Sequence, residues 1–341
     1  MRATAAVLRA IGGPLVLEEV EVDAPREGEV LVELRATGVC HTDLGAIEGE
    51  VELPLPAVLG HEGAGVVIAS RVDGLVAGDR VVLTFDSCGA CATCAAGRPA
   101  YCRQFHALNH SGRRADGSTT LGAVHGSFLG QSSFATHAIA SARNAVKVDA
   151  DDLVPLAALG CSVQTGAGAV LNVLRPDPGT SMAIFGCGAV GLSAVMAAHH
   201  AGCAEIVAVD PRPERTALAL ELGATATADR VRGMDYSVEA VGTEAAVAAA
   251  LRCLKSPGAC ATLGYRGPRN PITIDQGRLL FGRSLHGVIE GDPDPQAFIP
   301  RLVGMDLPLD RLVTTFPFAD VAGALEAART GAAIKPVLTF A

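Results

Sequence analysis

A glycine-rich turn in the middle of the chain restricts the fold more than any other sequence feature. A short apolar run, Met182–Phe185, precedes Gly186-Cys187-Gly188-Ala189-Val190-Gly191, and a helical pattern over 192–201 follows. The order strand, G-x-G-x-x-G, helix predicts a dinucleotide-binding βαβ unit. The first glycine permits the tight turn, the second lets a pyrophosphate approach the backbone, and the third lets the helix pack closely on the sheet. The N–H groups at the helix start then face the phosphates.

A second apolar run, 205–209, ends in Asp210, which lies 19 residues after Gly191. A carboxylate at this position can accept hydrogen bonds from the adenosine ribose, and it repels a 2′-phosphate. The sequence therefore predicts NAD rather than NADP. A bare G-x-G-x-x-G can arise by coincidence, but here the strands, the helix and the acidic residue all occur in the expected order.

Further strands are expected at 235–240, 259–264 and 284–289, with a helix at 244–254 between the first two. This succession predicts a six-stranded, doubly wound parallel sheet. The link between Gly223 and Met234 is too short for a full crossover helix plus a strand, so we expect a shortened crossover there.

The N-terminal part of the chain has a different pattern. Short runs separated by Gly and Pro turns predict strands within 4–35, and strands continue at 58–67, 80–85 and 127–139. A helix is expected to begin near 151 or 152, and the C-terminal part should hold a helix at 319–330 and a strand at 335–340. One core rarely supports 341 residues, so we expect two domains, one β-rich and one α/β.

Cys40 and His61 are candidate ligands of a catalytic zinc ion. Zinc prefers thiolate and imidazole ligands, and each candidate lies beside a carboxylate, Asp43 or Glu62, of the kind that orients a metal-bound histidine. Three protein ligands with an open fourth position make a catalytic site, and we expect Cys161 to supply the third. Taken singly, such a cysteine is more often a small buried hydrophobe and such a histidine a core residue. The two residues together, in this local sequence, favour a metal site.

Four cysteines predict a second metal site, of structural type. They follow the spacing C-x2-C-x2-C-x7-C, at Cys88, Cys91, Cys94 and Cys102. Four thiolates close a tetrahedron around one zinc and leave no position for substrate, so the metal would supply folding energy to the loop. Two disulfides or a redox pair are the alternative.

Charge and composition disfavour several classes of partner. The net charge of −9 argues against nucleic acid and anionic membrane surfaces. The N-terminus lacks a signal-peptide pattern, and no apolar run reaches membrane-spanning length. We therefore expect a cytoplasmic protein, whose ten cysteines are better explained by metal binding than by disulfides.

These motifs together resemble the zinc-dependent, medium-chain alcohol dehydrogenases over essentially the whole chain. The resemblance rests on GVCHTD, GHEGAG, the four-cysteine cluster, GCSVQTGAG, and the GCGAVG turn with its following Asp. Three segments are most similar to the aryl-alcohol (benzyl-alcohol) branch: LTFDSCGACATC, SFLGQSSFATHA and GAVGLSAVMAA. The resemblance implies a GroES-like catalytic domain at 1–162 and 289–341 around a Rossmann domain at 163–288. It also implies two zinc ions per subunit and a homodimer or homotetramer.

The resemblance implies roles for single residues. Glu62 would be an indirect or transient zinc ligand, Asp43 would support the ligand histidine, and Thr42 would pass the alcohol proton outward. The implied cofactor contacts, besides the glycine-rich turn and Asp210, are Thr165, Arg215 near the adenosine ribose, and Lys335 at the pyrophosphate. The implied walls of the substrate pocket are Phe85, Phe128 and Leu129.

Two features depart from the family pattern. Gly45 occupies the position, three residues after Thr42, where many relatives end the proton relay with a histidine. For His41, the nearest replacement, three interpretations stay open: a proton relay, a contact to cofactor phosphate, or an idle surface residue. The shortened segment after Gly223 is the second departure, with effects on adenosine binding or subunit packing left open.

The sequence thus predicts reversible hydride transfer between a primary alcohol, aryl or allylic, and NAD, giving the aldehyde. One alternative is a zinc enzyme for aliphatic, terpenoid or secondary alcohols. Two others are a zinc-free quinone or enone reductase, which would lack the ligands at 40, 61 and 161, and a non-catalytic NAD-binding protein, which would not need Thr42.

Overall fold

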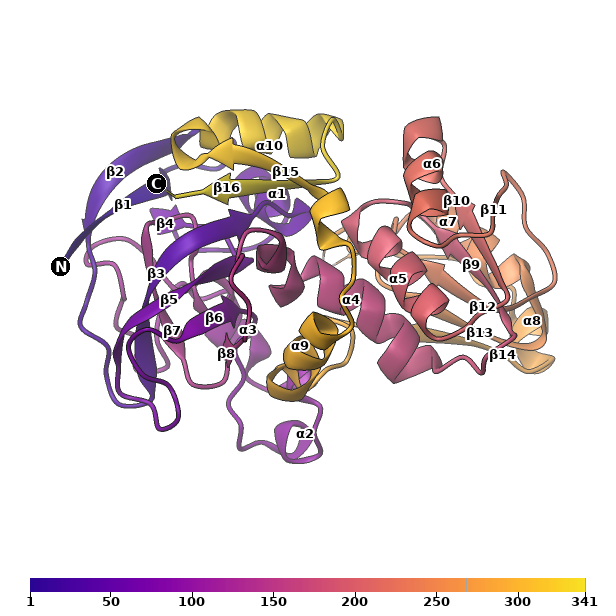
Figure 1. The fold of residues 1–341 in the computed structure, drawn as a ribbon, viewed down its shortest axis with the longest axis horizontal. Coiled ribbons are helices and arrows are strands. Elements are labelled where there is room, and N and C mark those ends of the chain that lie inside the picture. The colour runs from indigo at the N-terminus through magenta and orange to yellow at the C-terminus, as the bar shows by residue number, and fades with distance from the viewer. Residues whose placement is uncertain (268, 341) are drawn as a thin grey trace. The chain divides into compact units, whose positions relative to one another are not determined.

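The computed structural model describes residues 1–267 and 269–340, and the chain divides into two compact units. The first comprises Met1–Cys161 with Asp294–Ala341, and the second comprises Ser162–Pro293. Figure 1 shows strands dominating the first unit and a helix-flanked sheet in the second. The predicted fold class is therefore confirmed. Among the described residues, no helix has both the length and the apolar character needed to span a bilayer.

Strands build most of the first unit. They are β1 (Arg2–Leu8), β2 (Leu15–Glu21), β3 (Glu29–Gly38), β4 (Ala57–Val58), β5 (Gly63–Ser70), β6 (Arg80–Leu83), β7 (His137–Ser141), β8 (Ala145–Lys147), β15 (Val313–Pro317) and β16 (Lys335–Thr339). Three of them form a sheet in the order β2-β1-β4, and the others form a sheet ordered β15-β16-β3-β5-β6-β8, in which β7 also pairs with β3. Because β16 pairs antiparallel with β3, segments remote in sequence share one sheet.

The two faces of β3 contribute to different hydrophobic clusters. Val30, Val32 and Leu34 pack on one side, whereas Leu31 packs with a larger cluster on the other. This division follows from the two-residue period of a strand. The larger cluster contains Phe128 and Phe134, both fully buried, so the strands of this unit enclose the aromatic side chains that border the site described below.

The helices of the first unit are short. They are α1 (His41–Glu48), α2 (Ala92–Ala95), α3 (Phe105–Asn109), α9 (Pro295–Gly304) and α10 (Val321–Thr330). The helix expected from 151 or 152 is replaced by a 3-10 helix at Pro155–Gly160. Asp152 accepts a hydrogen bond from the N–H of Val154, which holds a local turn, and the helical segment begins only at the proline.

The strand expected over 127–139 forms only in its last part, as β7. A 3-10 turn occupies Phe128–Gly130, because Leu129 (φ 46°) and Ser132 (φ 52°) adopt left-handed backbone conformations. These positive φ values are incompatible with an extended strand.

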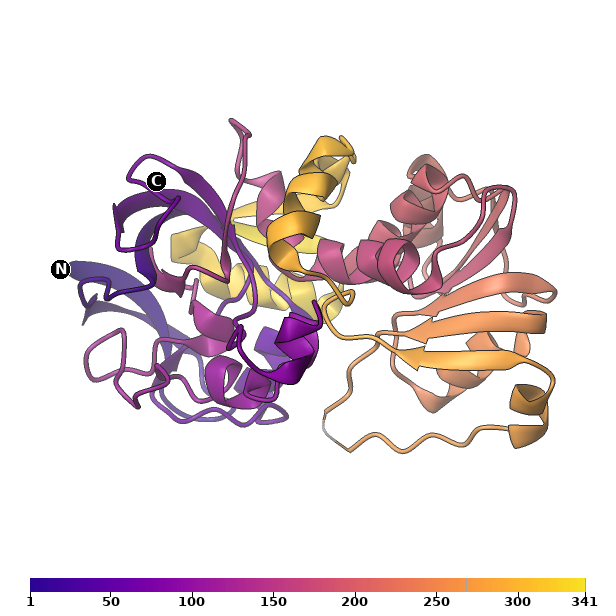
Figure 2. The same ribbon diagram turned by 90° about the horizontal axis from the view of Figure 1, so that it is seen from below.

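The second unit is a six-stranded parallel sheet with helices. Its strands are β9 (Ser181–Phe185), β10 (Glu205–Val209), β11 (Ala226–Thr227), β12 (Met234–Glu239), β13 (Leu254–Thr262) and β14 (Arg283–Gly287), and its helices are α4 (Ser162–Gly168), α5 (Ala189–His200), α6 (Pro213–Glu221), α7 (Glu244–Arg252) and α8 (Gln276–Leu280). The strand order β11-β10-β9-β12-β13-β14 is that of a doubly wound dinucleotide-binding sheet, and Figure 2 shows helices above and below the strands. The predicted six-stranded sheet is confirmed, and β11, with two residues, marks the shortened crossover.

One carboxylate links three neighbouring strands of this sheet. Asp235, at the start of β12, accepts hydrogen bonds from the N–H and hydroxyl of Ser181 on β9, at 2.9 and 2.7 Å, and from the Lys255 ammonium on β13, at 2.9 Å. The hydrogen bond from Lys255, reinforced by those from Ser181, lowers the pKa of Asp235 to about 2. The folded protein therefore favours the ionised form of Asp235 more than the unfolded chain does.

Replacing Asp235 should destabilise the second unit in a pH-dependent way. Because its folded pKa lies below the unfolded value, Asp235 stabilises the protein above about pH 4, and this contribution is lost as the pH falls towards 2. We expect Asp235→Asn to lower the free energy of unfolding by about 1 kcal/mol at pH 7, a value reduced for partial solvent exposure. Urea titration followed by tyrosine fluorescence measures the difference.

The exposed Asp229 provides the matched control. Asp229→Asn should leave the unfolding midpoint unchanged at every pH. A difference between Asp235→Asn and the wild type that stayed constant from pH 7 to pH 3 would contradict the role assigned to the ionised carboxylate.

Candidate active site

Four potential metal ligands converge in the first unit. Ligand atoms of Cys40, His61, Glu62 and Cys161 all lie within 4.8 Å of one another. Cys40 is the N-cap of α1, His61 and Glu62 directly precede β5, and Cys161 ends the 3-10 helix that starts at Pro155. Separate elements of the fold therefore deliver the two thiols and the imidazole, which sequence analysis had proposed as a set, to one point.

The donor set fits a zinc ion. The Nε2 atom of His61 is buried and has no hydrogen-bond partner among the described residues, and leaving a buried ring nitrogen unpaired is costly. The hydrogen bond with Cys161 lowers the pKa of the Cys40 thiol well below its ordinary value. A thiolate and an unpaired imidazole nitrogen are the ligand forms that zinc takes.

Asp43 fixes the orientation of the imidazole. Its fully buried carboxylate accepts hydrogen bonds from the N–H of Cys40 (2.9 Å) and of Gly60 (3.1 Å), and contacts Nδ1 of His61 at 3.0 Å. A carboxylate on Nδ1 leaves Nε2 as the metal-binding nitrogen. One side chain thus holds both Cys40 and His61 in place.

Glu62 forms a buried ion pair with Lys335. The ammonium of Lys335 lies 2.8 Å from Oε2 of Glu62 and donates to the carbonyl of Val39 at 3.2 Å. Burial by itself lowers the pKa of Lys335, but the Glu62 carboxylate raises it above its ordinary value, while burial raises the pKa of Glu62. A Cβ at Gly38 would lie 1.9 Å from Oε2 of Glu62, so this position requires glycine. The sequence prediction placed Lys335 on cofactor pyrophosphate, whereas here its ammonium is engaged by Glu62 and Val39.

The first turn of α1 carries the two other polar candidates. The Thr42 hydroxyl lies 3.8 Å from Sγ of Cys40, beside the four-ligand cluster. His41 is exposed, and its three interpretations stay open. Gly45 is one helical turn beyond Thr42, and the side chains of Glu50 and Val51 approach the position that a Cβ there would take, at 3.5 and 3.7 Å.

Aromatic rings border the cluster. The Phe128 ring lies edge-on to His61, with centroids 5.7 Å apart, and Phe85 contacts Phe105 at 5.8 Å. Phe128, Leu129 and Phe85, the predicted pocket walls, are all buried. An apolar border of this kind excludes water and strengthens electrostatic interactions near the ligands.

Gln131 is a residue of the site that sequence analysis missed. Its buried side chain accepts from the N–H of Gly63 at 3.0 Å and donates to the carbonyls of His61 at 3.0 Å and Thr84 at 3.1 Å. It therefore joins the chain around His61 to the segment before Phe85. The only sequence signal is a glutamine between Gly130 and two serines, which by itself resembles a solvated loop.

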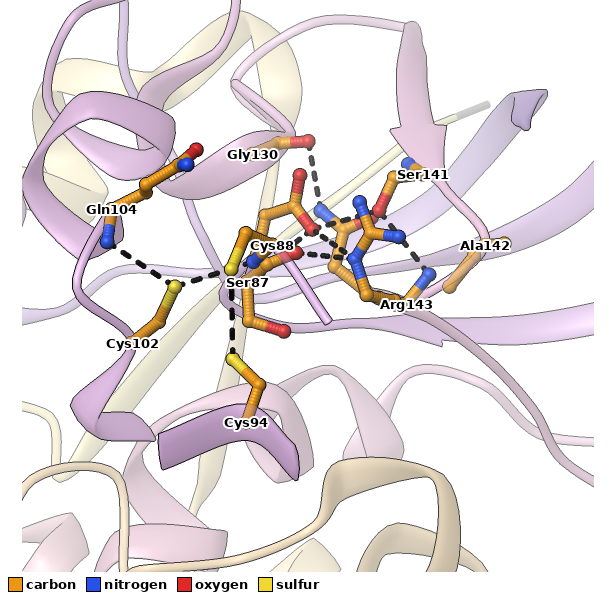
Figure 3. Close-up of polar contacts among 12 residues, drawn as sticks. Ser87, Cys88, Cys94, Cys102, Gln104, Gly130, Ser141, Ala142 and Arg143 are labelled. Carbon is orange, nitrogen blue, oxygen red and sulfur yellow. Dashed lines mark hydrogen bonds and ion pairs between the residues drawn. The ribbon is translucent and has the colours of Figure 1, made fainter. Parts of the chain in front are cut away.

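The four cysteines of the second cluster also come together. Ligand atoms of Cys88, Cys91, Cys94 and Cys102 lie within 4.8 Å of one another. Backbone N–H groups of Cys91 and Gln104 point at sulfurs of this cluster, each at 3.3 Å, and Figure 3 shows Cys88, Cys94 and Cys102 facing one another. A hydrogen bond with Thr93 lowers the pKa of Cys91 to about 5. Four sulfurs with amide donors could hold one metal ion of structural type, as the spacing predicts.

The loop of this cluster is anchored to the rest of the unit. Arg143 donates from Nε to the carbonyl of Ser87, next to Cys88 (Figure 3), and lies 3.6 Å from the carboxylate of Asp86. Asn109 holds both the N–H and the carbonyl of Asp86. The metal loop and the segment containing Phe85 are therefore parts of one hydrogen-bonded structure.

In the second unit, the glycine-rich turn has the geometry of a phosphate-binding loop. Gly186 has φ 90°, and a Cβ at Gly191 would lie 1.7 Å from the carbonyl oxygen of Gly186, so helix α5 starts in close contact with the turn. A Cβ at Gly188 would meet no other atom within 4 Å. The space beside Gly188 can therefore admit a pyrophosphate at the start of the helix.

The other predicted cofactor residues surround this turn. Asp210 accepts hydrogen bonds from the N–H groups of Cys187 (2.7 Å) and Arg212 (3.0 Å), so it borders the turn. Nε of Arg215 is buried with no hydrogen-bond partner among the described residues. Thr165 precedes Gly166, where a Cβ would lie 2.0 Å from the carbonyl oxygen of Val190. This close approach places α4 against the start of α5.

Comparison with known proteins adds independent findings. The chain matches the family model of the alcohol dehydrogenase GroES-like domain over 26–150 and that of the zinc-binding dehydrogenase over 189–303. It is 44% identical to a geraniol dehydrogenase from Castellaniella defragrans, in a match covering 99% of this chain and 98% of the relative.

Many solved structures share the fold, and two of them are at least 38% identical to this chain. One is benzyl alcohol dehydrogenase from Acinetobacter calcoaceticus, 38% identical with a TM-score of 0.96 over the whole of both chains. The other is an alcohol dehydrogenase zinc-binding domain protein from Burkholderia ambifaria, 45% identical with a TM-score of 0.96 over 99% of each chain.

Separate variants should affect the two metal clusters independently. Asp43→Asn removes the negative charge beside Nδ1 of His61. We expect this change to lower the affinity for one of the two zinc ions by about 10- to 100-fold. Cys91→Ser should instead release the other zinc and leave the first in place. Competition with a chromogenic chelator, with total zinc counted per chain, measures both effects. An equal loss of affinity for both zinc ions in Asp43→Asn would contradict the assignment of Asp43 to the His61 cluster.

Proposed function

This chain belongs to the zinc-dependent alcohol dehydrogenase family and is an NAD-dependent alcohol oxidoreductase, and we propose a substrate class for it. The proposed reaction is the oxidation of a primary aryl or allylic alcohol to the aldehyde at the Cys40–His61–Cys161 cluster. The observation that carries this proposal is the convergence of these ligands with Glu62 within 4.8 Å. The names of the relatives, which include a geraniol and a benzyl alcohol dehydrogenase, support an alcohol with an allylic or aromatic group next to the reacting carbon.

The chain's own residues account for positioning and proton transfer. When bound, zinc supplies Lewis-acid polarisation of the alcohol oxygen, and NAD accepts the hydride. Cys40, His61 and Cys161 would hold the zinc, and Asp43 fixes the imidazole that contributes to it. The Thr42 hydroxyl, 3.8 Å from Sγ of Cys40, would accept the proton that leaves the alcohol and donate its own outward.

The cofactor residues support NAD over NADP. The Asp210 carboxylate lies at the end of β10 and is held by two backbone N–H groups of the glycine-rich turn and the following segment. A carboxylate fixed at this position repels a 2′-phosphate and accepts hydrogen bonds from an unmodified ribose.

We also propose a cytoplasmic homo-oligomer. No disulfide joins any of the ten cysteines, all of which lie in the part of the chain that the structure describes, and this suits a reducing compartment. The edge strand β14 is preceded by Leu280 and Phe281, which are 74% and 73% exposed. An exposed apolar pair beside a sheet edge favours a protein–protein contact.

A substrate panel tests the proposed reaction. With NAD present, absorbance at the NADH band should rise with benzylic and allylic primary alcohols and rise less with short aliphatic or secondary alcohols. Removal of zinc with a chelator should abolish the rise, and restoring zinc should recover it. Turnover that survives complete removal of zinc would favour the zinc-free quinone or enone reductase instead.

Thr42→Val should slow turnover without disturbing the metal. Valine keeps the shape of threonine but cannot relay a proton, so we expect kcat to fall by about 10²- to 10⁴-fold. Zinc content and NADH binding should remain those of the wild type. Thr4→Val, on the exposed side of β1, is the matched control and should be fully active. A Thr42→Val enzyme with unchanged kcat would remove Thr42 from the proton path.

A further inference from the structure

A buried carboxylate at the end of β12 has no role in the mechanism above. Glu239 is fully shielded from solvent and is the last residue of this strand. One of its oxygens, Oε1, accepts hydrogen bonds from the N–H groups of Val241 and Gly242, at 2.7 and 2.5 Å. The other, Oε2, accepts a hydrogen bond from the Thr262 hydroxyl at 2.8 Å. Glu239 therefore holds the segment after β12 and ties it to the end of β13.

The segment after β12 lies against the glycine-rich turn. Phe185, the last residue of β9, pairs with Glu239 and accepts a hydrogen bond from the N–H of Ala240 at 2.9 Å. A Cβ at Gly186 would lie 2.6 Å from Cγ2 of Val241, so the two turns are in contact. Val241 is only half-buried, so part of its side chain remains accessible beside the turn that is proposed to hold the pyrophosphate.

This edge of the sheet is where a doubly wound fold binds its ligand. In the strand order β11-β10-β9-β12-β13-β14 (Figure 1), the chain proceeds from β9 to one side and continues on the other side at β12. Ligands bind beyond the carboxyl ends of the strands at such a switch point, and each half of the sheet takes one mononucleotide. Asp210, at the end of β10, is the proposed ligand of the adenosine ribose. The half that contains β12 and β13 therefore receives the nicotinamide mononucleotide.

All four backbone polar groups of Val241 and Gly242 have partners within the protein. Glu239 accepts from both N–H groups. The Arg266 guanidinium donates to the carbonyl of Val241 at 3.0 Å, and the Asn270 amide donates to the carbonyl of Gly242 at 2.7 Å. This segment therefore contributes to the crevice chiefly through its shape, with the Val241 side chain as an apolar wall.

We propose that Glu239 is a positioning residue for NAD, which holds Val241 as a wall of the crevice that receives the nicotinamide mononucleotide half. Glu239 acts through the N–H groups from which it accepts hydrogen bonds, and not through contact with the cofactor. Without an acceptor at this position, the turn would rearrange, because a buried N–H without a partner is costly. The wall would then move from its place beside the glycine-rich turn. This inference requires NAD binding alone and holds for any alcohol substrate.

Three variants of the zinc-loaded enzyme separate the acceptor from the charge. Glu239→Met has a similar volume but only a weak acceptor, the thioether sulfur. Glu239→Gln loses the charge, yet its amide oxygen can accept from both N–H groups and its NH2 can donate to the Thr262 hydroxyl. Ser237→Ala is the matched control, because it removes another buried hydrogen bond of β12, to the carbonyl of Ala250 at 2.9 Å, that does not involve the turn.

The proposal predicts a selective loss of affinity for the nicotinamide half. In Glu239→Met, Kd for NADH should rise at least about tenfold, because the displaced wall no longer fits the bound nicotinamide mononucleotide. Kd for ADP, which contains only the adenosine half, should stay within about twofold of the wild type. Glu239→Gln and Ser237→Ala should keep both Kd values within about threefold. The rise in NADH fluorescence on binding measures the first Kd, and isothermal titration calorimetry measures the second.

A further variant protects the test against misfolding of Glu239→Met. Thr262→Val keeps the carboxylate and removes one donor to it, so Kd for NADH should rise by about two- to fivefold and Kd for ADP should not change. An equal loss of NADH and ADP affinity in either variant would overturn the proposal, because Glu239 would then support the whole nucleotide-binding unit. Unchanged NADH affinity in Glu239→Met, or an equally large loss in Glu239→Gln, would also overturn it. Both titrations are made without alcohol, so their outcome is separate from that of the substrate panel.

Discussion

The buried ion pair between Glu62 and Lys335 is the interaction on which the proposed catalytic centre depends most. Both side chains are shielded from solvent, and removing one partner of such a pair typically costs about 3–5 kcal/mol, because the other charge is left buried and uncompensated. The pair ties strand β16 to the residue next to His61. It also explains Gly38, since any side chain there would occupy the space of the carboxylate. The proposed metal ligand His61 thus adjoins a contact that joins β16 to the segment before β5.

A second constraint lies in the turn that carries the pocket wall. Leu129 has φ 46°, and a non-glycine residue in this region costs about 1–2 kcal/mol. Three polar side chains hold the turn: Ser132 accepts from the N–H of Phe128, Asn144 donates to the carbonyl of Gly130, and Gln131 bridges to His61. The strained turn and the proposed zinc ligand are therefore fixed by one network, so the position of Phe128 relative to His61 is well defined.

The sequence was informative where spacing alone brings groups together. The four cysteines from Cys88 to Cys102 and the glycine-rich turn are local patterns, and local geometry determines what they form. Cys161 is different, because no spacing rule connects it to Cys40 and His61. Only the local sequence around Cys161 indicated that it could be a third ligand. The role of Gln131 could not be found this way, since a polar residue in a glycine-rich loop is usually solvated and the backbone groups that Gln131 binds belong to other segments. The helix expected near 151 is a 3-10 helix that begins only at Pro155, because the Asp152 side chain holds a local turn before it.

The position of Cys161 has a consequence for biosynthesis. It is the last residue of the first segment of the first unit, and the second unit, Ser162–Pro293, is one continuous segment. A continuous segment can fold as it leaves the ribosome, whereas Glu62 must wait for Lys335, which is translated after the whole second unit. All the proposed ligands, from Cys40 to Cys161, are synthesised before the second unit, whereas strand β16, which carries Lys335, is synthesised after it. Zinc delivery to this cluster is therefore expected to follow the folding of the nucleotide-binding part, and the four-cysteine loop can be loaded earlier.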